Sequence, residues 1–399
     1  MNSMGIKETG FAPSRFLTSF ARLIAPMQED EFRASYFEKK LLLLHRGDPD
    51  FYGDLFSIRD FDRALATSPD YVQTAEAKTN TNTKNEGDTA SGLESALGEF
   101  RKGGTLVLDG VHKREAKLGL LCRVLEQELG HYFQTNIYLT PPNGQGFNPH
   151  YDSHDVFVLQ ISGSKHWKVE KERRVFPGKR DLMGKDGREF LAPYDSFTLQ
   201  KGDMVYIPRG YVHAAECGSE PSLHITLGLV PTTWDDLLHA VVKAIVQSDP
   251  RLNEALPLGY LRGPGDDLVK GLVALRRKLG DEAFLNGVVD RYRDELVTKF
   301  PLDVSGVVET LCQPLNLKPD DVVGPRPGSV YRVSCDDEAV RIVFGARTVT
   351  FPGFLREPVA FALNTSVYEV RDITGGELED EEKVIFAARL MEEGLVVRK

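Results

Sequence analysis

Two histidines and one aspartate have the types and spacing of a metal site. His150 and Asp152 are two residues apart and lie just before the apolar run Val156–Ile161. Because side chains of an extended chain alternate between two faces, both point to the same side. A third imidazole, His213, follows the apolar run Met204–Ile207. Two imidazoles and one carboxylate can occupy one face of an octahedral iron and leave three positions open.

An H-x-D pair alone is weak evidence, because a chain with nine histidines shows one by chance at appreciable frequency. The flanking residues strengthen the interpretation. A Pro-Pro-Asn-Gly-Gln-Gly loop precedes the pair, Lys165 lies 15 residues after His150, and the turn Gly202-Asp203 leads into the run before His213. These features together favour a metal site over a chance pair.

Short β-rich runs separated by Gly, Pro and Asp must position these residues up to about residue 233. They are Thr105–Leu108, Asn136–Leu139, Val156–Ile161, His166–Val169, Met204–Ile207 and Leu223–Leu229. Many short strands without long intervening helices favour an antiparallel sandwich or barrel. The polar stretch Ala75–Gly92 has no large apolar side chain, so we interpret it as a mobile loop, either a passive insertion or a lid over the substrate.

From Trp234 to Phe300 the apolar residues recur at the spacing of an α-helix. Thr233 and Asp236 resemble a capping box. The apolar residues that then share one helical face are Leu237, Leu238, Val241, Val242 and Ile245. A further helical pair is expected at about Asp266–Leu279 and Asp281–Phe300, hinged at Gly280. Such helices can pack on their own domain or form a dimer interface.

The pattern is mixed from about Pro301 onwards. A hairpin around Gly345-Ala346 and two later helices are expected, and this order resembles a winged helix. The runs are Ala339–Phe344, Thr348–Phe351, Leu355–Leu363 and Asp380–Glu393. The acidic run Glu377–Glu382 argues against DNA binding by this module. We therefore expect three parts, 1–233, 234–300 and 301–399.

The composition is that of an ordinary soluble globular protein. Among 399 residues, 49 basic and 59 acidic side chains leave a formal charge of −10, which disfavours broad nucleic-acid binding and suits a basic protein partner. The four cysteines form no C-x-x-C pair. No apolar run reaches the length of a membrane helix, and Arg15–Met27 lacks the apolar centre of a secretory signal, so we expect a cytoplasmic protein.

Two segments carry a resemblance to a known family. YLTPPNGQGFNPHYDSHDVFVLQISGSKHW and GDMVYIPRGYVHAAE…SLHITLGL resemble the Jumonji-C (JmjC) oxygenases of the cupin-4 group, which include the ribosomal oxygenases. The resemblance covers roughly Phe37 to Leu229. It implies a double-stranded β-helix (jelly roll, cupin) catalytic domain, followed by a helical dimerisation region and a winged-helix-like module, and therefore a homodimer.

The resemblance also implies roles for individual residues. The family's metal ligands fall on His150, Asp152 and His213, and its cosubstrate-anchoring base falls on Lys165. Its Asn and Tyr match Asn136 and Tyr138, which share a strand face. Where some eukaryotic members place a Ser near the cosubstrate this chain has Gly228, so another polar group such as Thr140 would have to compensate.

The implied reaction is hydroxylation of a protein side chain, dependent on Fe(II) and 2-oxoglutarate. The expected target is an Arg or His of a ribosomal protein, since ribosomal proteins are basic. N-methyl-lysine demethylation uses the same iron chemistry, and a catalytically silent metal-stabilised cupin scaffold is an alternative of a different class. A buried Lys165 would satisfy the far carboxylate of 2-oxoglutarate, which argues against the silent scaffold.

Overall fold

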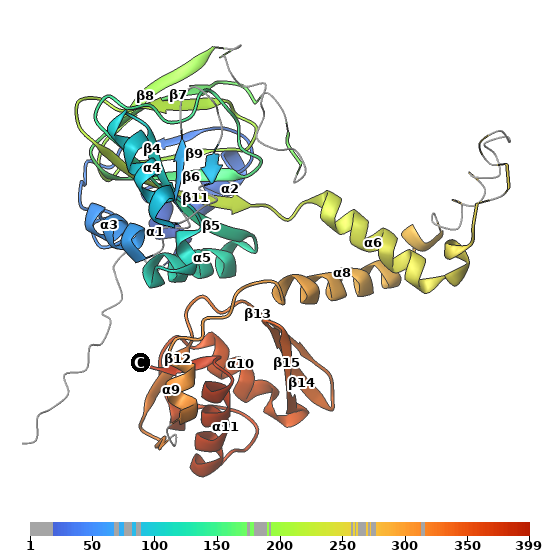
Figure 1. Cartoon of the computed structure of the whole chain (residues 1–399). Coiled ribbons are helices and arrows are strands. Elements are labelled where there is room, and N and C mark those ends of the chain that lie inside the picture. Colours follow the sequence, from blue (N-terminus) through green and yellow to red (C-terminus); the bar gives the residue numbers. More distant parts are fainter. Residues whose placement is uncertain are drawn as a thin grey trace, which may run out of the picture. The chain divides into compact units, whose positions relative to one another are not determined.

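The computed structural model describes residues 19–67, 72–75, 82–84, 89–173, 176–178, 190, 193–256, 258–259, 261, 269, 272, 277–312 and 316–399. The chain divides into two compact units, Met1–Pro231 and Thr232–Lys399 (Figure 1). The expected boundary at residue 233 lies close to this division. A separate part beginning at residue 301 stays a prediction.

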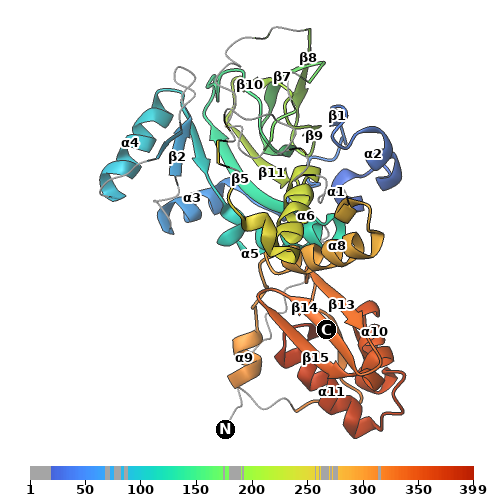
Figure 2. The ribbon, with the colours of Figure 1, turned by 90° about the vertical axis from the view of Figure 1, so that its right-hand side faces the viewer.

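The larger unit is built from two antiparallel sheets. The strands of the large sheet run in the order β1-β9-β6-β11-β5-β4-β2-β3, and those of the small sheet in the order β10-β7-β8. Their bounds are β1 (Leu42–Leu44), β2 (Val72–Ala75), β3 (Asn82–Lys84), β4 (Thr105–Leu108), β5 (Tyr132–Thr140), β6 (Asp155–Ser162), β7 (Lys165–Glu170), β8 (Tyr194–Leu199), β9 (Met204–Ile207), β10 (His213–Glu216) and β11 (Ser222–Val230). The six predicted β-rich runs all lie within these strands. Residues of both sheets line one cavity, as in the expected double-stranded β-helix. Figure 2 shows the strands of both sheets in the larger unit.

Alternation along β6 separates the two sides of the large sheet. Phe157 and Leu159 belong to the main hydrophobic core, which includes residues of several helices. Val156 and Val158 belong to a second cluster that also contains Trp167 of the small sheet. Because successive side chains point to opposite faces, a strand covered on both sides reads as a continuous apolar run.

Helices cover the outer side of the large sheet. They are α1 (Phe20–Ile24), α2 (Glu29–Ser35), α3 (Ile58–Thr67), α4 (Thr89–Arg101) and α5 (Ala116–Leu129), with a short 3-10 helix at Val111–Lys113. The expectation that no long helices intervene between the strands was therefore wrong. In α5 the buried Leu118, Leu121, Cys122 and Leu125 recur at helical spacing, a signal that was present in the sequence.

The polar stretch Ala75–Gly92 also contains regular structure. Asn82–Lys84 pair with β2 as β3, and α4 begins at Thr89. The interpretation of the whole stretch as a loop was wrong for these residues, because pairing with a neighbouring strand supplied backbone partners that composition does not reveal. Residues 76–81 and 85–88 of this stretch lie outside the described part of the chain.

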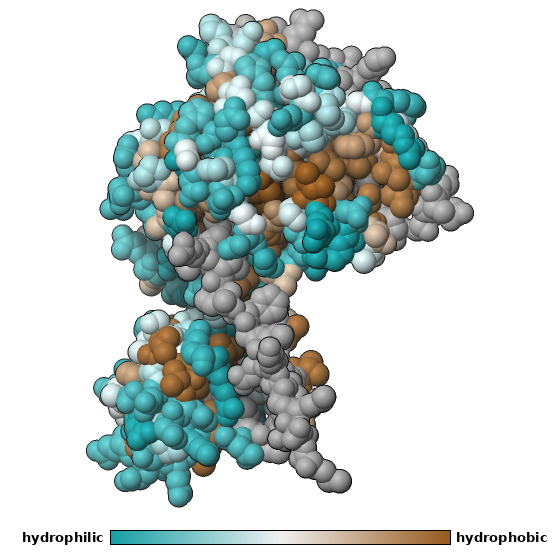
Figure 3. Space-filling model, turned by 90° about the vertical axis from the view of Figure 1, so that its left-hand side faces the viewer, coloured by the Kyte–Doolittle hydropathy of each residue, from teal (hydrophilic) through white to brown (hydrophobic). Residues whose placement is uncertain are grey.

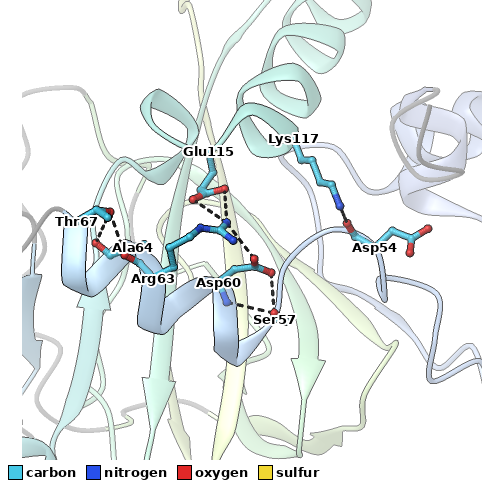
Figure 4. Close-up of polar contacts among 8 residues, drawn as sticks. All are labelled: Asp54, Ser57, Asp60, Arg63, Ala64, Thr67, Glu115 and Lys117. Carbon is cyan, nitrogen blue, oxygen red and sulfur yellow. Dashed lines mark hydrogen bonds and ion pairs between the residues drawn. The ribbon is translucent and has the colours of Figure 1, made fainter. Parts of the chain in front are cut away.

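Polar contacts join α3 to the start of α5 (Figure 4). The Ser57 hydroxyl accepts a hydrogen bond from the Asp60 backbone N–H and donates one to the Asp60 carboxylate. Arg63 then bridges Asp60 and Glu115, at 3.0 and 3.2 Å. Lys117 donates to the backbone carbonyl of Asp54. These bonds hold α3 and α5 side by side on the sheet.

The smaller unit begins with the predicted capping box. Thr233 and Asp236 exchange the two expected bonds at the start of α6 (Trp234–Ser248). A 3-10 helix at Pro250–Asn253 follows, and α8 (Glu282–Val297) begins after its N-cap Asp281. Most of the helix expected at Asp266–Leu279 lies outside the described residues. The buried Val241 and Ile245 of α6 pack with Val288 of α8.

The rest of this unit surrounds a separate core. Its elements are α9 (Val307–Cys312), β12 (Val322–Pro325), β13 (Tyr331–Cys335), β14 (Ala339–Phe344), β15 (Arg347–Pro352), α10 (Arg356–Asn364), β16 (Tyr368–Glu369), α11 (Asp380–Glu392) and β17 (Val396–Arg398), with 3-10 helices at Gly353–Leu355 and Val370–Asp372. The predicted hairpin is β14 and β15, which turn at Gly345 with a φ of 50°. Gly394, with a φ of 78°, follows α11 and lets the chain reverse into β17.

On the face shown in Figure 3, the surface of the larger unit is mostly hydrophilic, and hydrophobic side chains gather in one region of it. Among the described residues, no helix has both the length and the apolar character needed to span a bilayer.

Candidate metal centre

His150, Asp152 and His213 lie together at one end of the cavity. One potential ligand atom from each residue lies within 4.8 Å of the others. His150 and Asp152 belong to the segment between β5 and β6, whereas His213 is the first residue of β10. Two imidazoles and one carboxylate at this spacing match the donor set of a facial metal site.

Backbone hydrogen bonds fix the two segments that carry these side chains. The His213 N–H donates to the His150 carbonyl at 2.8 Å, and the His150 N–H donates to the His213 carbonyl at 3.1 Å. The Gly210 N–H also donates to the Asp152 carbonyl, at 3.0 Å. The backbones at residues 150 and 213 are therefore joined by an antiparallel bridge, which holds the two side chains at a fixed separation.

Each imidazole is oriented by a hydrogen bond to the carbonyl two residues before it in the chain. Nδ1 of His150 lies 2.8 Å from the Asn148 carbonyl, and Nδ1 of His213 lies 3.0 Å from the Tyr211 carbonyl. A carbonyl only accepts, so each Nδ1 carries the proton and each Nε2 keeps its lone pair. Nε2 of His213 lies 3.6 Å from an Asp152 carboxylate oxygen. The His213 ring thus offers Nε2 toward the carboxylate, and in His150 the atom not engaged by the backbone carbonyl is also Nε2.

Burial and neighbouring charges favour the metal-binding protonation states. Burial, assisted by the nearby His150, lowers the pKa of His213 to about 4. Burial alone would raise the pKa of Asp152, but His154, His213 and His150 together outweigh it and lower that pKa. At neutral pH the site holds a neutral His213 and an ionised carboxylate, as metal coordination requires.

Asp155 holds the turn between β9 and β10 that carries His213. Its fully buried carboxylate accepts hydrogen bonds from the Arg209 backbone N–H at 2.8 Å and from the Tyr206 hydroxyl at 2.7 Å. The Arg209 guanidinium lies 2.7 Å from a Glu38 carboxylate oxygen and donates to the Pro177 carbonyl, so it serves the fold.

Lys165 lies in the cavity without a carboxylate partner among the described residues. It is 3% exposed, and its Nζ donates to the Thr140 hydroxyl at 2.8 Å. Burial lowers its pKa to about 8. The Thr140 hydroxyl also lies 2.8 Å from that of Thr105, so its position is fixed from two sides. A buried cation next to a cavity is a suitable anchor for an anionic ligand.

Of the two other residues that the resemblance indicates, only one lines the cavity. Tyr138 does, and its ring stacks on His224. The side-chain Oδ1 of Asn136 accepts a hydrogen bond from the Gly110 N–H at 3.0 Å, and the residue is not part of the lining. The side chain of Asn136 therefore ties β5 to the turn after β4, and its cosubstrate role stays a prediction.

Gly228 does not leave a gap near Lys165. In the pairing of β11 with β5, Gly228 is opposite Gln134, whereas Thr140 is opposite Ser222, six residues away. A side chain at position 228 would collide with the His154 ring, whose nearest atom lies 2.6 Å from an ideal Cβ. Position 228 therefore lies beside His154 and six residues along β11 from the residue opposite Thr140, and compensation by Thr140 stays a prediction.

The remaining aromatic residues near the site differ in their contacts. His166 contacts Thr198 and Ser196 through its two ring nitrogens, which is a structural role. Trp167 is buried and also lines the cavity. His224 lies in an apolar strand, but it lines the cavity with an unpartnered Nδ1, because its strand face is turned inward.

The cavity has an empty volume of about 480 Å³ when the space at its opening to solvent is included. The triad lies along one part of its wall and Lys165 along another, with the apolar Val156, Val158 and Phe147 also in the lining. The arrangement can hold a divalent metal next to a small anionic molecule.

Comparison with known proteins identifies the domain that contains this cavity. Residues 114–237 match the family model described as JmjC domain. Ribosomal oxygenase 1 of Gallus gallus is 31% identical over 299 residues, covering 68% of this chain and 49% of that protein. The NO66 protein of Aedes aegypti, named a bifunctional lysine-specific demethylase and histidyl-hydroxylase, is 30% identical over 312 residues, covering 71% and 48%. The chain thus spans about half the length of these curated relatives.

Solved structures support the fold. The ribosomal oxygenase YcfD of Escherichia coli in complex with cobalt and 2-oxoglutarate superposes with a TM-score of 0.55 at 17% identity, covering 93% of this chain and 98% of that one. Its complex with cobalt and succinic acid gives a TM-score of 0.56 at 16% identity, with the same coverage. The likeness covers both units. The likeness shows the fold alone, whereas the JmjC match and the sequence relatives show that this chain contains a JmjC domain.

Proposed function

We propose that this protein is an Fe(II)- and 2-oxoglutarate-dependent dioxygenase that hydroxylates a protein side chain. The observation that carries the proposal is the pairing, in one cavity, of the His150, Asp152 and His213 triad with the buried cation Lys165. A structural metal would need neither open coordination positions nor a buried lysine. This pairing therefore argues against a silent cupin scaffold.

The residues present fit both groups. Nε2 of His150, Nε2 of His213 and the Asp152 carboxylate would hold Fe(II), since both Nδ1 atoms are already engaged with backbone carbonyls. Lys165, with Thr140 beside it, would hold the far carboxylate of 2-oxoglutarate, and Tyr138 would form part of the same wall. Iron with 2-oxoglutarate supplies the oxygen activation, which yields succinate and carbon dioxide.

The chain's own residues bind, orient and shield. The backbone bridge between His150 and His213 sets the metal geometry before the metal binds, so little reorganisation is required. The apolar lining, including Val156, Val158 and Phe147, keeps water away from the reacting atoms. No side chain has to act as a nucleophile or general base.

We propose an Arg or His in an exposed segment of a ribosomal protein as the target. Two observations support this class: the relatives include proteins named ribosomal oxygenase, and the formal charge of −10 favours encounter with basic polypeptides.

Demethylation of N-methyl-lysine is the second candidate. It rests on the relatives whose name joins lysine-specific demethylase with histidyl-hydroxylase. The iron chemistry is shared, so the cavity geometry fits both reactions. The two differ in product mass, because hydroxylation adds an oxygen and demethylation removes a methylene.

The test is to incubate the purified protein with Fe(II), 2-oxoglutarate and matched basic peptides that contain Arg, His or N-methyl-lysine. Formation of succinate, with a gain of one oxygen on the Arg or His peptide, is the expected result. Loss of a methylene from the methyl-lysine peptide alone would establish the second candidate. Absence of succinate with every peptide and with ribosomal proteins would contradict both.

A further inference from the structure

His224 lies in the wall of the cavity that also contains the metal triad and Lys165. Along the same face of β11, a Cβ at Gly228 would meet His154, whereas Ser222 is opposite Thr140, which bonds Lys165. His224 is two residues from Ser222 and four from Gly228. Because alternate residues of a strand share a face, the imidazole belongs to the lysine end of the cavity.

Two aromatic rings fix the orientation of this imidazole. The Tyr138 ring stacks on it with the planes 2° apart and the centroids 4.8 Å apart. The Trp167 ring meets it edge to face, with the centroids 5.7 Å apart. Held between these rings, His224 is not free to turn toward another partner.

Polar atoms at this position lack protein partners. The His224 imidazole makes no hydrogen bond to another described residue, and its Nδ1 is buried, as is the unpartnered Nε1 of Trp167. His224 is 3% exposed. A buried polar atom without a partner is costly, so such atoms in a cavity wall point to a bound water or ligand.

We propose that His224 donates a hydrogen bond to the far carboxylate of the dicarboxylate that Lys165 binds, in both 2-oxoglutarate and succinate. The inference rests on the proposed function and adds a binding residue to it. Burial, assisted by the Lys165 charge, lowers the pKa of His224 well below its ordinary value. The ring is therefore neutral and has one N–H to give. Lys165 uses one of its three protons on Thr140, and a carboxylate can accept from both residues.

The test is calorimetric binding to the Mn(II)-loaded protein. His224→Phe keeps the stack on Tyr138 and removes the ring nitrogens. We expect it to weaken the binding of 2-oxoglutarate and of succinate by roughly 10- to 100-fold, the effect of one hydrogen bond to a charged group. The binding of 2-oxopentanoate, which has a methyl group in place of the far carboxylate, should not change. His224→Asn, which keeps a donor near the position of Nδ1, should bind 2-oxoglutarate more tightly than the similarly sized His224→Leu.

Other outcomes of the same binding experiments would overturn the proposal. Equal losses for 2-oxoglutarate and 2-oxopentanoate would place the effect at the metal or in the fold and overturn the proposal. Unchanged binding of all three ligands would show that His224 contacts only water. If His224→Phe does not fold, the Asn and Leu variants make the same comparison. A folded wild-type protein that binds Mn(II) but not 2-oxoglutarate would refute the proposed function itself, and the role of His224 with it.

Discussion

The Lys165 ammonium donates to the Thr140 hydroxyl at 2.8 Å inside a cavity where no described carboxylate pairs with it. Thr140 fixes the direction of the side chain but cannot neutralise its charge. The folded protein therefore carries an uncompensated buried cation, which is unfavourable without a ligand and useful with one. Two of the following predictions depend on this relationship.

Replacing Lys165 with Met should stabilise the ligand-free protein while removing its affinity for 2-oxoglutarate. The pKa of Lys165 is about 8 instead of its ordinary 10.5, so at pH 7 the folded state bears the cost of keeping the amine charged. Met retains most of the apolar stem without the charge. We expect a gain of roughly 1–3 kcal/mol in the free energy of unfolding. Urea unfolding without ligand checks it, and a destabilised variant would contradict the account.

The affinity for 2-oxoglutarate should fall above pH 8. Below the pKa of about 8 the ligand-free Lys165 is protonated, and above it the amine must take up a proton to bind the carboxylate. The dissociation constant should therefore stay flat below pH 8 and rise about tenfold per unit above it. Lys165→Arg stays charged throughout, so its affinity should not change between pH 8 and 10. Parallel curves for both proteins would show that another group controls binding.

Replacing His150 or Asp152 with Ala should abolish iron-dependent turnover and leave the fold largely intact. The hydrophobic core of the larger unit contains neither residue, so the barrel does not depend on the metal. Succinate formation measures the first effect, and circular dichroism measures the second. His166→Ala is a matched control, since among the described residues its ring nitrogens bond Thr198 and Ser196 and not the triad. Near-normal activity of the His150→Ala variant would show that His150 is not a metal ligand.

Asp155→Ala should weaken metal binding and change its geometry, because Asp155 holds the turn that carries His213. We expect roughly 10- to 100-fold weaker binding of Co(II) and an altered Co(II) absorption spectrum. Asp203→Ala is the control. Asp203 is also buried and accepts backbone N–H bonds from Arg46 and Gln200, but at the other end of β9. If Asp155→Ala and Asp203→Ala lose similar stability and both change the Co(II) spectrum, the effect of Asp155 on the metal site is not specific.

We propose a homodimer that uses the exposed side of α6. Trp234, Leu238 and Val242 follow one another at four-residue spacing and are 80%, 57% and 51% exposed. The buried Val241 and Ile245 pack within the chain, so a charge there would disturb the α6–α8 pair itself. Leu238→Asp and Val242→Asp together should give monomers in sedimentation experiments while retaining helical content. Wild-type protein that sediments as a monomer at micromolar concentration would refute the dimer.

Elements whose signals lie within a few residues could be predicted from the amino-acid sequence. The strands around residues 156–161 and 204–207, the capping box at Thr233 and the hairpin at Gly345 depend on alternation, on a side chain three residues away or on a turn. The grouping of His150, Asp152 and His213 was also predicted, because a two-residue spacing and a family resemblance placed all three.

Contacts between side chains that are far apart in the sequence could be found only from the tertiary structure. Arg209 pairs with Glu38, 171 residues away, and Lys165 reaches Thr140, 25 residues away, because of how the strands are ordered in the two sheets. His224 looks like a core residue in its apolar strand, and only the pairing of β11 with β5 and β6 turns it into the cavity. Side-chain alternation specifies two faces of a strand, but sheet assembly determines which face becomes the wall of a binding site.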